Sequence, residues 1–141
     1  MSNLARDLSR DDATQLVAIV AYDDDQLIVK TSEDRYAARR AVSCLVEPEA
    51  GDEVLCSVLA DGRVFILAVL TRDCRDVTLA SDGNLEVRPA GRFSVATGAG
   101  VDLVSSGEVN VTSDALNVNS RSGSVMVAEL RYLGRFLQSE V

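Results

Sequence analysis

The chain has 141 residues, with 14 Lys and Arg against 22 Asp and Glu, which gives a formal net charge of −8. This acidic balance argues against a nucleic-acid partner, because proteins that bind phosphate backbones gain affinity from clustered Lys and Arg. The sequence has no His, which excludes Ser-His-Asp and Cys-His nucleophile chemistry and removes the commonest neutral metal ligand. Apolar residues make up 47% of the chain, enough for a packed core in one small domain with an appendage.

The first residues and the cysteines indicate a cytoplasmic protein. Residues 1–12 contain no long apolar stretch, so no secretory signal is expected, and no window reaches the roughly 18 apolar residues of a membrane-spanning helix. Cys44, Cys56 and Cys74 form no Cys-x-x-Cys pair, which predicts three buried, reduced thiols. We therefore expect no membrane partner, and export, if it occurs, through an apparatus that reads no signal peptide.

Short apolar runs separated by turn residues occupy the first half of the chain. The runs lie at residues 16–21, 26–30, 53–59 and 64–70. Three aspartates separate the first two runs, and an Asp-Gly turn separates the last two. Both arrangements predict β-hairpins, since Asp and Gly tolerate the backbone conformations of tight turns.

A third strand is predicted within residues 36–46, although the Ala-Ala-Arg-Arg-Ala stretch inside them also suits a helix. With the two hairpins this makes five strands within about 55 residues, which favours a small closed barrel of the OB type. The barrel is expected at residues 16–72, after an N-terminal arm at 1–15.

From Val77 onward, an apolar–x–apolar pair recurs every eight residues. The first five pairs keep this step, and the next steps of seven and nine preserve the period overall. The pairs are Val77 with Leu79, Leu85 with Val87, Phe93 with Val95, Val101 with Leu103, Val109 with Val111, Leu116 with Val118, and Val125 with Val127. A fixed short period is typical of a stacked repeat rather than a compact globule.

The period limits what one copy of the chain can bury. Alternation along a strand puts both members of each pair on one face, so each unit offers only two sizeable side chains. Three chains wound round one axis would share these side chains and pair every strand. We therefore predict an intertwined homotrimeric β-prism at residues 73–127, with the fourteen paired side chains as its core. A single-chain β-solenoid is the alternative, although no superperiod of 16 or 24 residues marks its coils.

The segment 128–141 breaks the octad. Leu130, Leu133, Phe136 and Leu137 fall at positions i, i+3, i+6 and i+7, which predicts a short amphipathic helix. Such a helix would either cap the open end of the prism or dock a partner.

Three stretches of the barrel region resemble a known group of proteins. Residues 38–46 (ARRAVSCLV), 51–56 (GDEVLC) and 64–70 (VFILAVL) are similar to an uncharacterised bacterial family encoded in type VI secretion loci. The order of barrel and octad prism resembles the central spike of contractile injection machines, as in VgrG proteins and phage tail spikes, without the large hub domains of VgrG. The resemblance implies a spike-like structural or adaptor protein that helps to load or dock an effector or tip protein. Its partners would be itself and the tip, spike or effector proteins of the apparatus.

No residue set predicts a catalytic, cofactor or metal site, so no enzyme and no cofactor are expected. The turn Asp23-Asp24-Asp25 lacks the spaced ligands of a calcium loop and predicts a solvated turn, and Arg39-Arg40 predicts a solvent-facing position. The alternative function is a monomeric β-solenoid binding module or polysaccharide-acting enzyme, for which the outward positions offer no aromatic platform. An OB barrel that binds single-stranded nucleic acid is opposed by the charge and the few aromatics.

Overall fold

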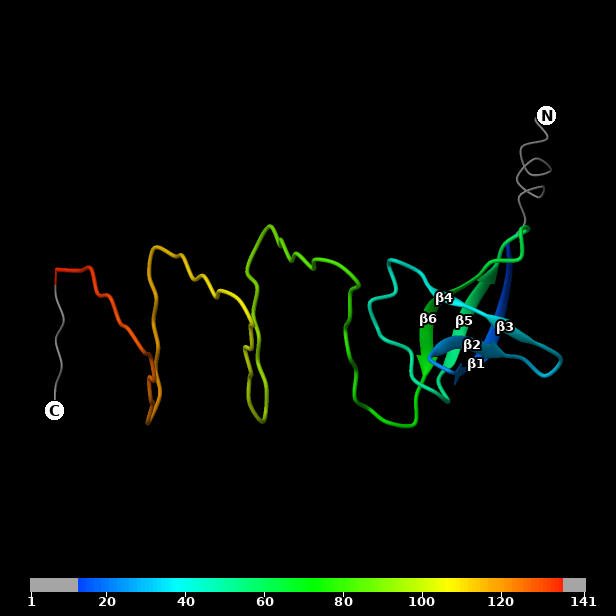
Figure 1. Cartoon of the computed structure of the whole chain (residues 1–141), viewed down its shortest axis with the longest axis horizontal. Coiled ribbons are helices and arrows are strands. Elements are labelled where there is room, and N and C mark those ends of the chain that lie inside the picture. Colours follow the sequence, from blue (N-terminus) through cyan, green and yellow to red (C-terminus); the bar gives the residue numbers. More distant parts are fainter. Residues whose placement is uncertain (1–12, 136–141) are drawn as a thin grey trace, which may run out of the picture. The chain divides into compact units, whose positions relative to one another are not determined.

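The computed structural model describes residues 13–135, and the chain divides into two units, Met1–Arg92 and Phe93–Val141 (Figure 1). All regular structure in the described residues is β-structure, which confirms the predicted all-β class. Nothing between residues 13 and 135 forms a helix that could span a bilayer. The first two repeat pairs belong to the first unit, because that unit extends beyond the predicted boundary near residue 73.

Six strands form one mixed sheet in the order β3-β2-β1-β5-β6-β4. The strands are β1 (Thr14–Asp23), β2 (Gln26–Lys30), β3 (Arg35–Ala37), β4 (Arg39–Arg40), β5 (Glu53–Val58) and β6 (Val64–Thr71). The pairs β1–β2, β1–β5, β2–β3 and β5–β6 are antiparallel, whereas β4 runs parallel to β6.

Both predicted hairpins are confirmed. The β1–β2 turn holds Asp24 and Asp25 at φ values of 46° and 66°, the left-handed region that Asp tolerates better than most residues. In the β5–β6 turn, Gly62 has a φ of 87°, where a Cβ would be strained. These two turns set the register of the antiparallel strands.

The third predicted strand is split, and its two parts pair with opposite edges of the sheet. Ala38 alone separates β3 from β4; its N–H donates to Leu27 O at 3.0 Å, while Ala41 N–H donates to Ile66 O at 3.0 Å. The backbone therefore pairs with β2 and β6 in turn, and this tertiary pairing overrides the helix propensity of the Ala-Arg stretch. The sheet must curl until its two edges meet at Ala38.

One buried cluster fills the concave side of this curled sheet. Its members are Ala18, Val20, Val29, Ala38, Cys44, Val54, Cys56, Val64 and Ile66. In β1 the buried Ala18 and Val20 alternate with the exposed Val17 and Ile19, as expected for a strand with one face in a core. Two irregularities in the β5–β6 register bend the pair further, because a bulge sharpens local twist.

The described part of the second unit, residues 93–135, contains neither strands nor helices, and every side chain in it is exposed. The predicted helix at 128–141 is therefore wrong for residues 128–135, and Phe136 and Leu137 lie outside the described residues. Helices shorter than about 12–15 residues are marginal in water, and most of their stability comes from packing against a neighbour. The side chains of residues 128–135 are all exposed, so burial of an apolar face does not stabilise a helix there.

Candidate functional site

The fourteen apolar side chains of the octad repeat, predicted as the core of a prism, are open to solvent in the single chain. Their exposed fractions run from 56% for Val127 to 83% for Leu103. One copy of the chain therefore leaves more than half of every predicted core side chain exposed, because each unit brings only two apolar side chains.

This exposure makes the repeat the candidate functional surface. Single exposed apolar side chains are ordinary on folded proteins. A long regular series of them instead indicates a surface made for contact with another protein, since water is excluded from such a surface only when a second apolar surface covers it.

The backbone of the repeat is also largely unpaired within one chain. Val46 and Leu79 form an isolated antiparallel bridge, and residues 81–135 join no β-ladder with any other part of the described chain. Strand backbone groups need hydrogen-bond partners once they are removed from water. The repeat can therefore become β-structure only when further backbone is brought beside it.

The two described residues of the predicted docking tail are exposed as well. Leu130 is 75% and Leu133 is 81% exposed. Because this stretch is not helical, the structure does not gather them on one helix face.

The first repeat unit is joined to the curled sheet at a well-defined junction. Glu47 N–H donates to Thr78 O at 2.9 Å, and Ala80 N–H donates to Leu45 O at 2.9 Å, on either side of the Val46–Leu79 bridge. The loop between β4 and β5 thus supplies a short strand partner for the beginning of the repeat.

A buried ion pair fixes this junction. Asp52 is 1% exposed, and its two carboxylate oxygens accept hydrogen bonds from Arg72 Nε at 2.9 Å and Nη2 at 2.6 Å. The same guanidinium donates to Glu47 O at 2.8 Å and to Asp76 O at 2.7 Å. Arg72 therefore ties the loop, the end of β6 and the start of the repeat together, which its planar fork of donors makes possible. We call these contacts the Arg72 clamp.

The loop is held from a second side by Tyr22, whose hydroxyl donates to Pro48 O at 2.6 Å. Burial raises the pKa of this hydroxyl, and the nearby Glu47 and Asp52 carboxylates raise it further. Tyr22 therefore stays protonated and keeps its donor across the ordinary pH range.

The clamp predicts an acid-sensitive fold. Hydrogen bonds from Arg72 hold the pKa of Asp52 below its ordinary value of 3.8, against the opposing effect of burial. The Asp52 carboxyl of the unfolded chain therefore binds a proton more readily than that of the folded chain. The stability that Asp52 contributes is fully present above pH 3.8, and it is lost as the pH falls through the lowered pKa of the folded protein. Urea unfolding of the wild type should show this loss in that acidic range, and Asp52→Asn should remove that part of the pH dependence. An identical pH profile for the two proteins would contradict the assignment.

Sequence reasoning missed the Arg72 clamp. Asp52 stands in a Gly-Asp turn and Arg72 directly after the last strand, both ordinary places for charged residues, and 20 positions separate them. No spacing rule connects such residues; only the hairpin of β5 and β6 brings them together.

Two predictions about single residues need correction. Arg39 is exposed as predicted, but the side chain of Arg40 is only 17% exposed and lies 3.9 Å from Asp82. Cys44 and Cys56 are buried as predicted, whereas Cys74 is exposed because it lies in the turn after β6, outside the core. All three cysteines are free thiols, and burial raises the pKa of Cys56 to about 11.

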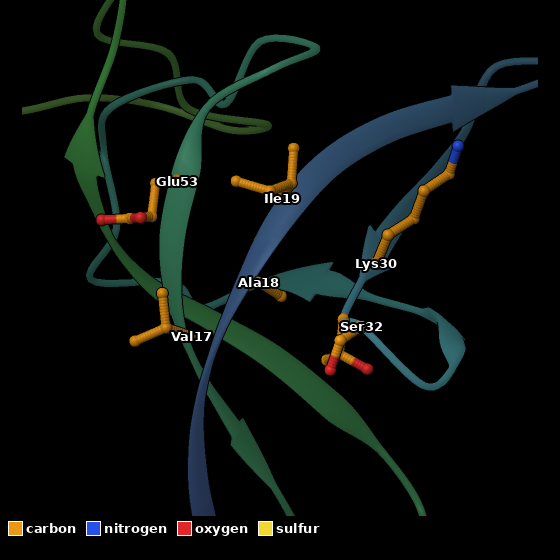
Figure 2. Close-up of a pocket in the computed structure, with 7 residues that line it drawn as sticks. Val17, Ala18, Ile19, Lys30, Ser32 and Glu53 are labelled. Atoms are coloured by element: carbon orange, nitrogen blue, oxygen red, sulfur yellow. The ribbon is translucent and has the colours of Figure 1, made fainter.

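The outer face of the sheet carries an open depression of about 470 Å³. Its floor includes Val17 and Ile19 of β1, and Glu53 and Lys30 lie on its two sides, on the strands that flank Ile19. Figure 2 shows the carboxylate and the ammonium group pointing away from each other. They therefore do not converge on one reacting atom, as a general acid and base must.

Among residues 13–135, no group of three or more Cys, Asp or Glu side chains is arranged to hold a metal ion. The Asp23–Asp25 turn instead contributes Asp23 to an exposed ion pair with Arg35, at 3.5 Å.

Comparison with known proteins gives a family without an assigned activity. No curated protein and no solved structure matches the chain. The family model described as "Protein of unknown function (DUF3540)" matches residues 17–141, from the first strand of the sheet through the repeat and the tail. Since this match covers most of the chain, the protein belongs to the DUF3540 family.

Proposed function

We propose that this protein is a non-enzymatic, homotrimeric, spike-like structural or adaptor protein of a contractile injection apparatus of the type VI class. In this assembly the curled sheet is an OB-type barrel and the octad repeat is an intertwined β-prism. The observation that carries the proposal is the exposure of all fourteen repeat side chains in a single copy of the chain.

The strand topology supports the OB-type barrel. When β3 and β4 are taken as one broken strand, the sheet runs from β2 through β1, β5 and β6 and returns to that strand by a parallel pairing. Closing a sheet in this way leaves few unpaired edges, which small β-domains need to avoid edge-to-edge association. The chain then passes from β6 straight into the repeat.

The exposed apolar pairs and the missing ladder partners of the repeat support the prism. Three copies can place their apolar pairs in a common interior and provide each other's ladder partners. The apolar side chains are then removed from water and the strand backbone groups are hydrogen-bonded at the same time. Opening one strand of such a prism breaks contacts to two other chains, which gives a narrow, mechanically resistant body suited to a spike.

The single-chain alternatives have less support. A β-solenoid pairs each coil with the next coil of the same chain, and residues 81–135 form no such ladder. A polysaccharide-acting enzyme needs clustered acids, and the depression on the sheet presents one carboxylate and one ammonium group that diverge (Figure 2).

The connection to a secretion apparatus rests on the resemblance of the barrel stretches and of the barrel–prism order. An adaptor needs a surface for its partner, and the exposed Leu130 and Leu133 of the tail are the best placed for docking an effector or tip protein after the prism has formed. The net charge of −8 disfavours nucleic acid as that partner.

The oligomeric state tests the proposal. Native mass spectrometry of the purified full-length protein should give three times the 15.1 kDa mass of one chain. A stable, well-folded species of one-chain mass would contradict the prism and, with it, the spike-like role. Pull-down of a tip, spike or effector protein from cells that express the secretion locus should then succeed with the wild type and fail with a double variant, Leu130→Asp with Leu133→Asp, that retains the trimer mass.

A further inference from the structure

The junction between the sheet and the repeat has one closed and one open strand edge. The hydrogen bonds around the Val46–Leu79 bridge use Thr78 O and Ala80 N–H. In an antiparallel pair, successive residues direct their backbone groups to opposite sides, so the N–H and C=O of Leu79 point away from residues 45–47. Within residues 13–135, Leu79 makes no backbone hydrogen bond on that side. An unpaired edge of this kind is a template for another strand.

The closed edge is rigid before any partner arrives. Arg72 holds Glu47 O at 2.8 Å and Asp52 at 2.6 Å, and Tyr22 holds Pro48 O at 2.6 Å. The loop is thus fixed directly after Val46, the residue that bridges to Leu79. Preorganisation lowers the entropic cost of adding a partner to the opposite edge.

An apolar pocket of about 210 Å³ lies beside this junction. It is lined by side chains from the loop, from the end of β6 and from the first repeat unit: Val46, Val69, Leu70, Thr71, Arg72, Cys74 and Val77. Leu70 is 47% and Val77 is 63% exposed, so the pocket is open to a side chain that arrives with a second strand. A strand with apolar residues at alternate positions would fill the pocket while it pairs with Leu79.

We propose that the open edge of residues 77–80 and this pocket form the site at which a second copy of the chain is added, and that residues 45–47 close the other edge so that the ladder grows in one direction only. The occupant is a second copy because the repeat itself has the required apolar–x–apolar pattern, and because the side chains of the six pairs that follow Leu79 are exposed as well. The site rests on the proposed trimer and identifies the place where its ladder begins.

Hydrogen exchange on the wild-type assembly provides the test. Ala80 N–H is bonded within one chain, whereas Leu79 N–H has a partner only if a second copy is added. We expect both amides to exchange at least about 100-fold more slowly than in an unstructured peptide. Free exchange at Leu79 beside a protected Ala80, in protein of trimer mass, would overturn the site and leave the trimer standing. A one-chain mass would overturn both.

A pair of variants tests the same edge by substitution. Leu79→Pro removes the N–H of residue 79 that no backbone carbonyl between residues 13 and 135 accepts, and it keeps the Thr78 C=O and the Ala80 N–H that bond to the loop. Proline also restricts the residue before it to extended backbone, which suits Thr78 beside the Val46–Leu79 bridge. Leu79→Ala is the matched control, because it loses the side chain but keeps the N–H. We expect Leu79→Pro to weaken the assembly at least tenfold more than Leu79→Ala, as measured by dissociation on dilution. Equal effects of the two substitutions would contradict the proposed edge.

Discussion

Replacing Val109 by Asp is expected to abolish the trimer. In the proposed prism this position faces the common axis, so the substitution would place three carboxylates in an apolar interior, where each unpaired charge costs several kcal/mol. Size-exclusion chromatography with light scattering should show loss of the three-chain species and aggregation of the product. Val101→Asp should behave in the same way, because Val101 holds the equivalent place one period earlier.

Asn110→Asp is the matched control for this experiment. It introduces the same carboxylate one residue further along, at a position that strand alternation directs to solvent. This variant should keep the trimer mass. If Val109→Asp and Asn110→Asp both remained fully folded and trimeric, the inward assignment of the apolar pairs would be wrong.

The second large effect is expected at the Arg72 clamp. Asp52→Asn should lower the free energy of unfolding of the sheet by about 3 kcal/mol, because it removes the buried partner of the ion pair. The guanidinium then keeps the more exposed Glu49 carboxylate, at 3.7 Å, as a weaker countercharge. Asp52 is 1% exposed and also accepts a hydrogen bond from Glu49 N–H at 2.7 Å, so water cannot readily replace the lost charge. Urea denaturation at neutral pH measures the change.

Asp23→Asn provides the comparison for Asp52→Asn. It makes the same chemical change in the exposed Arg35–Asp23 pair, whose side chains are 57% and 62% exposed. Exposed pairs contribute less than about 1 kcal/mol, so this variant should unfold close to the wild type. Equal destabilisation by the two substitutions would show that burial of the Asp52 pair has no special consequence.

In the proposed assembly, protonation of Asp52 would act on the repeat through the junction. Protonation of Asp52 would weaken the bonds by which Arg72 holds the loop that bridges to Leu79. The strand edge offered to a second copy would then lose its rigid backing. The contributions of the clamp and of the repeat can be measured separately, because Asp52→Asn changes only the clamp and Val109→Asp changes only the repeat.

The local signals in the sequence identified much of the sheet. The aspartates of the first hairpin and the Asp-Gly turn of the last one predict turns from backbone conformation alone, and the structure has positive φ values at Asp24, Asp25 and Gly62. The predicted helix at 128–141 is wrong for residues 128–135. The spacing of apolar residues shows which face a helix would bury, but a short helix is stable only when another part of the protein covers that face.

The all-β class, the two hairpins and the octad of apolar pairs can be predicted from residues that are neighbours along the chain. Contacts between distant residues set how residues 35–40 divide between opposite edges of the sheet, how Asp52 meets Arg72, and how Val46 bridges to Leu79. Those last two contacts join residues 20 and 33 positions apart. The first depends on the pairing of β5 with β6, and the second on how the loop between β4 and β5 lies against the start of the repeat, rather than on any local preference.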